Sequence, residues 1–126
     1  MIQCFNFLFA GPWSRYGQNL AAGPGFGSWS NTIQAWYNEV KDFDATTVGS
    51  YQYTSATSHY SQVAWADSYA IGCGYTVCST GWSPIYACNY GPPGNYLGQT
   101  VYQVGSPASA CPVGTVPNDG LCAPSL

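Results

Sequence analysis

The protein has 126 residues, of which 46% are apolar and 6% are charged, and its formal net charge at pH 7 is -3. Arg15 and Lys41 are its only basic residues and cannot neutralise a row of phosphates, which excludes a nucleic-acid-binding protein. The 15 glycines and 9 prolines predict one loop-rich domain, and no apolar run approaches the roughly 20 residues that a membrane-spanning helix needs.

Residues 1–30 are rich in glycine and predict irregular structure. Six cysteines in so short a chain are typical of oxidising compartments, so we expect a secreted, extracellular protein with disulfide bonds. Residues 1–10 have no basic start and only a short apolar run, so we expect the true amino terminus to lie upstream. The alternative is a weak signal peptide cleaved near Ala10, which would remove Cys4 and leave an odd number of cysteines.

A helix is predicted over residues 31–43, because apolar side chains recur there at helical spacing: Ile33, Trp36, Tyr37 and Val40. Asn31 is expected to cap its amino terminus. Glu39 falls at the edge of the apolar stripe, at a boundary with the interior. From periodicity alone, an exposed carboxylate is the simpler interpretation.

A second helix is predicted over residues 55–65, with His59, Gln62, Val63 and Ala66 on one face. His59 is the only histidine of the chain. A single histidine beside apolar neighbours is usually packed and hydrogen-bonded, and it does not form a metal site by itself.

A β-hairpin is predicted next, because residues 69–77 alternate apolar with small residues and residues 84–90 follow after a short loop. If the hairpin is centred between residues 80 and 81, Cys73 lies directly opposite Cys88. Opposed side chains have Cβ atoms about 4.5 to 5.5 Å apart, which is close to the span of a disulfide. We therefore predict a bond between these two cysteines.

The chain after this hairpin is rich in turn-forming residues. Residues 91–94 read Gly-Pro-Pro-Gly, which predicts a turn. Residues 100–104 predict a short strand, and a proline-rich tail that carries Cys111 and Cys122 follows.

Two long stretches carry a family resemblance. Residues 58–65 read Ser-His-Tyr-Ser-Gln-Val-Ala-Trp, and residues 85–96 read Ile-Tyr-Ala-Cys-Asn-Tyr-Gly-Pro-Pro-Gly-Asn-Tyr. They resemble, in the right order, the two signatures of the CAP superfamily (cysteine-rich secretory proteins, antigen 5 and pathogenesis-related 1 proteins), and the chain looks like a venom-allergen-like member. Residues 16–21 resemble its Gly-Glu-Asn-Leu-Ala segment, and residues 33–40 resemble its second helix. The signature residues are His59, Tyr60, Gln62, Trp65, Cys88, Asn89, Tyr90, Gly94 and Asn95.

The resemblance implies an α+β fold, a three-layer α-β-α sandwich stabilised by disulfides. It implies a CAP domain over residues 1–105 that lacks its first helix, and a hinge-like tail with cysteines over residues 106–126. Without that helix one face of the sheet would lose its cover, so we expect the chain to be a fragment of a longer secreted protein.

The resemblance also implies the disulfide pairs. Cys73 and Cys88 correspond to a pair that recurs in the family. Cys4 resembles a cysteine that precedes the Gly-Glu-Asn segment, and Cys78 is its expected partner. In the tail, Cys111 is expected to pair with Cys122. A longer cysteine-rich module, which gives some relatives ion-channel activity, is not expected after Leu126.

Members of the family line a central groove with two histidines and two glutamates. By resemblance His59 and Glu39 are groove residues, and Gln18 stands where the family often has the other glutamate. The second histidine belongs to the missing first helix. We therefore expect no metal site in the chain as written, and zinc only if a missing amino-terminal helix supplies a second histidine.

The function expected from the resemblance is a non-catalytic binding module, with a sterol or another lipid as its ligand. The 11 Tyr, 5 Trp and 5 Phe residues suit an apolar ligand, and residues 23–29 and 51–53 are candidate loops for its entrance. The alternative is an allergen-like or venom-like extracellular effector that recognises a receptor or channel protein.

An enzyme is the third hypothesis. His59 could act as a general base oriented by Glu39, with Ser61 as the nucleophile. Side chains two residues apart on a helix point in different directions, however, so His59 cannot easily activate Ser61. We therefore expect no catalytic site.

Overall fold

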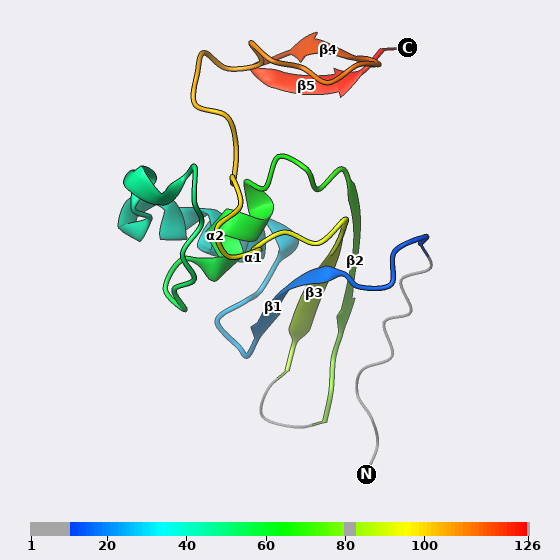
Figure 1. The fold of residues 1–126 in the computed structure, drawn as a ribbon. Coiled ribbons are helices and arrows are strands. Elements are labelled where there is room, and N and C mark those ends of the chain that lie inside the picture. The colour runs from blue at the N-terminus through cyan, green and yellow to red at the C-terminus, as the bar shows by residue number, and fades with distance from the viewer. Residues whose placement is uncertain (1–10, 80–82, 126) are drawn as a thin grey trace.

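The computed structural model describes residues 11–79 and 83–125, and its centre is a three-stranded antiparallel sheet (Figure 1). The strands are β1 (Gly17–Ala22), β2 (Ala70–Thr76) and β3 (Ile85–Gly91), in the order β1-β3-β2. The helices are α1 (Trp29–Asn38) and α2 (Ser58–Val63), with short 3-10 turns at η1 (Glu39–Asp42) and η2 (Ala45–Thr47). The fold is α+β, as predicted, and within the described residues no helix is long and apolar enough to cross a bilayer.

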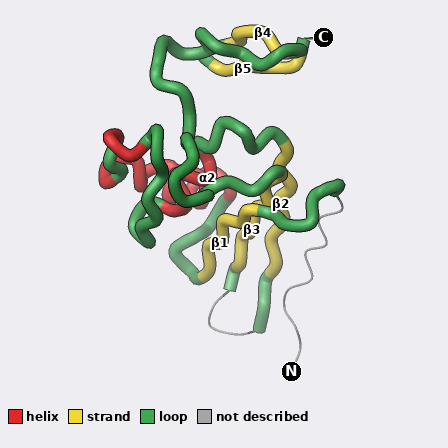
Figure 2. The backbone as a smooth tube through the Cα atoms, viewed as in Figure 1, coloured by secondary structure: helices red, strands yellow, loops and turns green. Residues whose placement is uncertain are grey.

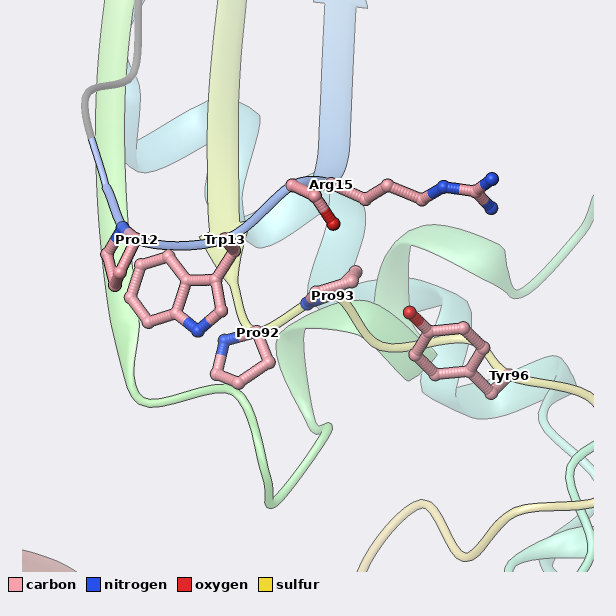
Figure 3. Close-up of a pocket in the computed structure, with 7 residues that line it drawn as sticks. Pro12, Trp13, Arg15, Pro92, Pro93 and Tyr96 are labelled. Atoms are coloured by element: carbon pink, nitrogen blue, oxygen red, sulfur yellow. The ribbon is translucent and has the colours of Figure 1, made fainter.

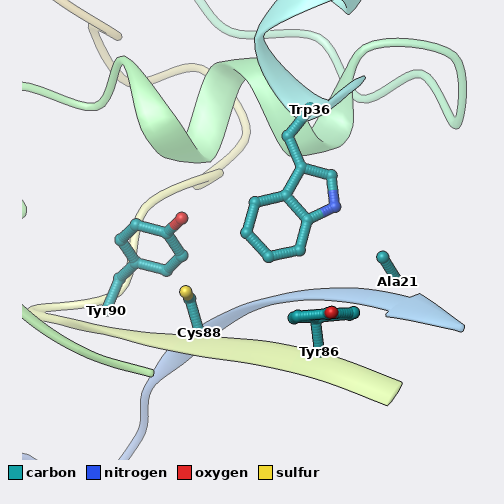
Figure 4. Close-up of a cluster of buried hydrophobic side chains, with 5 residues drawn as sticks. All are labelled: Ala21, Trp36, Tyr86, Cys88 and Tyr90. Atoms are coloured by element: carbon teal, nitrogen blue, oxygen red, sulfur yellow. The ribbon is translucent and has the colours of Figure 1, made fainter. Parts of the chain in front are cut away.

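The main core lies between the sheet and the helices. Its members come from β1, α1 and β3: Ala21, Trp36, Tyr86, Cys88 and Tyr90 (Figure 4). Both α-helices of the described residues lie on this face of the sheet (Figure 2). Burial raises the pKa of Tyr90 to about 12, because the phenolate would lose its hydration there.

Strand β1 lies in the part of the chain for which irregular structure was predicted, and that prediction was wrong. The side chains that face the helices from β1 are those of Asn19 and Ala21, which are 1% and 5% exposed. A buried amide at one inward position removes the alternation of apolar and polar residues that marks a strand. Asn19 is tolerated there because its amide donates hydrogen bonds to the His59 carbonyl and the Tyr90 hydroxyl.

The first helix begins earlier than predicted. Ser28, and not Asn31, is the cap, and its hydroxyl accepts the Asn31 N–H at 3.1 Å. The predicted apolar stripe is only partly buried, because Trp36 is 3% exposed while Ile33 and Tyr37 are 47% and 50% exposed. The helix places Thr32 and Trp36 on the side that faces the sheet. The short side chain of Thr32 allows the helix to approach the sheet closely.

The second helix is shorter than predicted and shows a different face to the interior. The buried residues of α2 are Tyr60, Ser61 and Gln62, whereas Val63 of the predicted face is 37% exposed. Polar side chains thus fill positions that periodicity assigns to apolar ones. They are satisfied by partners outside the helix.

The predicted hairpin is confirmed. In the β2–β3 pair Cys73 lies opposite Cys88, and the two form a disulfide. β3 is the central strand, so its other edge pairs with β1, where Asn19 lies opposite the same Cys88.

The strand predicted over residues 100–104 does not form. Val101 is nevertheless fully buried, and it packs in a second core with Tyr51 and Trp65. Its backbone donates to the Val48 carbonyl and accepts from the Ala66 N–H, each at 2.8 Å. An irregular segment that buries apolar side chains and is held by single hydrogen bonds can show the same pattern of apolar residues in the sequence as a strand.

The tail forms a separate two-stranded hairpin, β4 (Thr115–Asn118) with β5 (Leu121–Pro124), drawn apart from the sheet in Figure 1. The predicted Cys111–Cys122 disulfide closes it. Cys78 is also disulfide-bonded, and its predicted partner Cys4 lies outside the described residues.

Replacing both Cys111 and Cys122 by Ser is expected to unfold the tail hairpin alone. An isolated two-stranded hairpin is marginally stable in water, and here the disulfide restrains it. Hydrogen exchange should show protection lost in β4 and β5 and kept in β3, with the stability of the rest unchanged within about 0.5 kcal/mol. Loss of protection in β3 would contradict the division of the chain near residue 105.

Candidate functional site

The predicted groove residues Glu39 and His59 form a side-chain pair between η1 and α2. Glu39 Oε1 lies 2.7 Å from His59 Nδ1, and the side chains are 20% and 34% exposed. An ionised carboxylate can only accept hydrogen bonds, so the Nδ1 atom carries the proton that joins them. The interpretation of Glu39 as a simple surface carboxylate was therefore wrong, because periodicity does not show a partner twenty residues away.

Glu39 also caps helix α2. Its Oε2 atom accepts the backbone N–H groups of His59 and Tyr60 at 2.9 and 3.0 Å. Thr57, the residue at the cap position, makes no side-chain cap hydrogen bond, because its hydroxyl pairs with that of Thr54. A carboxylate from another helix thus supplies both the acceptors and the negative charge that a helix amino terminus favours.

His59 is held through both its ring and its backbone. It stacks on the Trp36 indole with ring centroids 6.1 Å apart and planes inclined by 21°. The backbone of His59 is held by the Asn19 side-chain amide, which donates to the His59 carbonyl at 3.0 Å. The pair therefore joins α1, α2 and β1 beside the main core.

Gln18, the third predicted groove residue, lies apart from this pair. Its exposed amide donates to Asn89 Oδ1 on β3 at 2.8 Å. Gly17 and Asn19 face α2, because a Cβ at Gly17 would collide with Gln62 and Asn19 binds His59. Neighbouring side chains of a strand point to opposite faces, so the predicted trio of His59, Glu39 and Gln18 is reduced to a pair.

The described residues contain no cluster of three His, Cys, Asp or Glu side chains that could hold a metal ion. Glu39 and His59 offer two ligand types that zinc accepts, but the proton on Nδ1 and the capping bonds already occupy the atoms that face each other. Three or four protein ligands are usual for zinc, so this pair does not form a site alone.

Ser61, the candidate nucleophile, faces the interior and not His59. It is fully buried, and its hydroxyl donates to Asn95 Oδ1 at 2.7 Å. The Tyr51 hydroxyl lies 3.2 Å away, and the Asn95 amide in turn donates to the Ser58 carbonyl at 2.9 Å. Ser61 and Asn95 therefore form a hydrogen-bonded network between α2 and the turn that follows β3. We call this network the clamp.

Gln62 extends the same clamp. Its Oε1 accepts the Gly94 N–H at 3.0 Å, and its Nε2 donates to the Ser68 hydroxyl at 3.1 Å. Gly94 lies against Trp65, where an added Cβ would come within 2.5 Å of the indole. The structure thus brings residues of the two predicted signatures into contact. These contacts hold α2 against the chain segment that follows β3.

The remaining signature residues support the cores. Tyr60 packs edge-on against Tyr37 and Phe43, and burial, followed by its hydrogen bond to Tyr102, raises its pKa to about 12. Cys88 and Tyr90 lie in the main core, and Asn89 pairs with Gln18.

The two loops predicted at a ligand entrance mainly anchor the cores. Tyr51 is fully buried, and Phe26 and Trp29 pack against the main core. Only Tyr53 of these aromatic side chains projects into solvent, with 62% exposed. The aromatic residues predicted to receive a ligand were needed to fill the interior of a chain with few aliphatic side chains.

An exposed apolar surface lies elsewhere, on β2. Two of its side chains, Ile71 and Tyr75, lie on the strand, and two, Tyr69 and Val77, directly flank its ends; all four are at odd-numbered positions and are 57% to 77% exposed. We call these four residues the β2 stripe. Ile71 and Tyr75 lie opposite Tyr90 and Tyr86 of the main core, so the stripe is on the same face of the sheet as the helices but is left uncovered by them. The alternation in the sequence located the strand, but it did not show that this side remains exposed.

Known proteins of one family resemble this chain in sequence. The family model described as CAP, cysteine-rich secretory protein family, matches residues 3–90. Cysteine-rich secretory protein 1 of Mus musculus is 41% identical over 113 residues, which cover 86% of this chain and 44% of that protein. The cysteine-rich venom protein of Tityus serrulatus is 41% identical over 84% of this chain and 28% of its own length. The chain therefore spans less than half of these two relatives.

Solved structures show the same fold. The crystal structure of NaASP2 with Zn²⁺ has a TM-score of 0.67 and 27% identity, and the match covers 96% of this chain and 67% of that one. Venom allergen-like protein 4 of Schistosoma mansoni has a TM-score of 0.56 and 26% identity, over 75% of this chain and 55% of that one.

Proposed function

The chain belongs to the cysteine-rich secretory protein (CAP) family, and from that membership we propose that it is a secreted, non-catalytic module that binds a sterol or another lipid. The observation that carries the proposal is the β2 stripe. Four large apolar side chains lie exposed on β2 and at its two ends, without a charged residue between them in the sequence. Contiguous exposed apolar surface of this kind marks binding sites in soluble proteins.

The geometry of the stripe suits a flat apolar ligand. The Tyr75 ring stacks on Tyr86 of β3, with centroids 5.5 Å apart and planes inclined by 22°, so its orientation is supported by the neighbouring strand. Cys73 lies between Ile71 and Tyr75 and is tied to Cys88, which restrains the strand. Burial of this surface against a rigid sterol would be favourable at about 25 cal/mol per Å².

The absence of catalysis is part of the proposal, and the bonding at Glu39 and His59 supports it. Both carboxylate oxygens of Glu39 are engaged, and the only nearby hydroxyl considered as a nucleophile, that of Ser61, is buried against Asn95. A general base must reach the proton it removes. The Glu39–His59 pair is better suited to holding α2 in place than to catalysing a reaction.

The test is the binding of dehydroergosterol, followed by its fluorescence, to the full chain and to two matched variants. Ile71→Ser with Val77→Ser removes two side chains of the stripe. Val104→Ser with Val113→Ser removes two apolar side chains that are more exposed but lie outside it. Lost burial of two aliphatic side chains should weaken binding at least about tenfold in the first variant. The control pair should bind like the original protein.

Two results would overturn the proposal. One is the failure of both dehydroergosterol and oleate to bind saturably. The other is an equal loss of binding affinity in the two double variants.

The second candidate is an extracellular effector that recognises a receptor or channel protein. It is favoured by the 41% identity to a protein named as a cysteine-rich venom protein. Failure of both lipids to bind would favour it.

A further inference from the structure

A pocket with a volume of about 370 Å³ has neither Glu39 nor His59 in its lining, and it borders the β2 stripe only where Trp13 contacts Tyr69. One wall comes from the segment before β1, with Pro12, Trp13 and Arg15. The other comes from the turn after β3, with Pro92, Pro93 and Tyr96 (Figure 3). Pockets that bind small organic molecules usually measure about 300 to 1,000 Å³, so this one suits a small ligand.

The apolar walls of the pocket are held in place. The Trp13 indole lies so close to Gly91 that an added Cβ there would collide with the ring. Trp13 also makes edge-on contacts with Tyr16 and Tyr69, at centroid distances of 6.1 and 5.6 Å. The proline rings opposite are rigid by their covalent structure. Ligand binding would therefore cost little conformational entropy, because this surface is already ordered.

The charge of the pocket is opposite to that of the protein. Arg15 is one of two basic residues in a chain with a net charge of -3. Arg15 lines the pocket, and Figure 3 shows its side chain extending away from Trp13, toward the side on which Tyr96 lies. Within the part of the chain that the structure describes, the single ion pair is that of Glu39 with His59. The Arg15 guanidinium is therefore free to bind an anion, and its planar fork suits a carboxylate.

From these observations we propose that the pocket binds a small aromatic carboxylate. The flat ring of the ligand lies among Trp13, Tyr96 and the prolines, and its carboxylate accepts hydrogen bonds from Arg15. A neutral ring would gain only the apolar contact, and an anion without a ring would gain only the ion pair. The combination of one cation with proline and aromatic walls selects for both parts.

The test compares 2-naphthoate with its neutral analogue 2-naphthamide by isothermal titration calorimetry on the full chain. We expect 2-naphthoate to bind saturably and the amide to bind about tenfold or more weakly, since a hydrogen bond to a charged group contributes about 1.5 to 3 kcal/mol. Arg15→Gln should remove this difference. Lys41→Gln changes the net charge equally at an exposed residue outside the pocket, and it should leave binding unchanged.

A second pair of variants tests the apolar wall. Tyr96→Ser should weaken 2-naphthoate binding, whereas Tyr53→Ser, at an exposed tyrosine outside the pocket, should not. The Ile71→Ser and Val77→Ser variant should also bind 2-naphthoate normally, so this pocket and the β2 stripe are tested separately. Equal binding of acid and amide, or equal losses in Arg15→Gln and Lys41→Gln, would overturn the proposal.

Discussion

Replacing Glu39 by Ala is expected to lower the free energy of unfolding by about 2 to 4 kcal/mol, because it leaves two partly buried N–H groups at the start of α2 without an acceptor. The His59 ring loses its partner in the same variant. Since Thr57 makes no cap hydrogen bond, no nearby side chain replaces the carboxylate. Urea denaturation followed by circular dichroism measures the change.

Two further variants separate the hydrogen bonds from the charge. Glu39→Gln keeps one oxygen for the N–H groups and presents an amide to His59, so its expected loss is about 1 kcal/mol. Asp42→Ala removes an exposed carboxylate from the same η1 turn and should change stability by less than about 0.5 kcal/mol. If Glu39→Ala were no more destabilising than Asp42→Ala, Glu39 would not be the cap of α2.

Gly94→Ala is expected to destabilise the protein by about 2 to 3 kcal/mol through overpacking. The new Cβ would lie 2.5 Å from Trp65 Cγ and 2.9 Å from Gln62 Nε2. Both neighbours are buried, with 3% and 2% exposed, so neither can move into solvent. The Trp65 ring would have to shift within a core that it shares with Tyr51 and Val101. The shift of the thermal midpoint reports the loss.

Gly25→Ala provides the matched control, since a Cβ there meets nothing within 4 Å. An alanine at such an open position reduces the entropy of the unfolded chain and should be neutral or stabilising by up to about 1 kcal/mol. Equal midpoints for the two variants would show that the contact between the turn after β3 and Trp65 is looser than the structure indicates.

Local sequence patterns predicted the parts of the fold that depend on neighbouring residues. The β2–β3 hairpin and its Cys73–Cys88 bond follow from strand alternation and a symmetric register. The helix near Trp36 follows from apolar spacing. By contrast, the sequence did not predict β1, because Asn19 takes one of its inward positions. The buried amide is satisfied by the His59 carbonyl and the Tyr90 hydroxyl, which are distant in the sequence.

The candidate site shows the same limit. Motif resemblance selected Glu39, His59 and Gln18 together, but a motif does not state which face of a strand a side chain takes. The structure joins Glu39 to His59 and directs Gln18 to Asn89. It also turns Ser61 toward Asn95, so that the signature residues act as a clamp.

The sequence by itself determined the family, the α+β class, the central hairpin and the scarcity of positive charge, since motifs, periodicity and composition are local or additive properties of the chain. Only the tertiary structure decided that Glu39 caps a helix twenty residues away, that the apolar side of β2 remains exposed, and that Arg15 borders a pocket with Tyr96. Each of these depends on which distant segments pack together. That is set by the balance of burial and hydrogen-bond satisfaction over the whole chain.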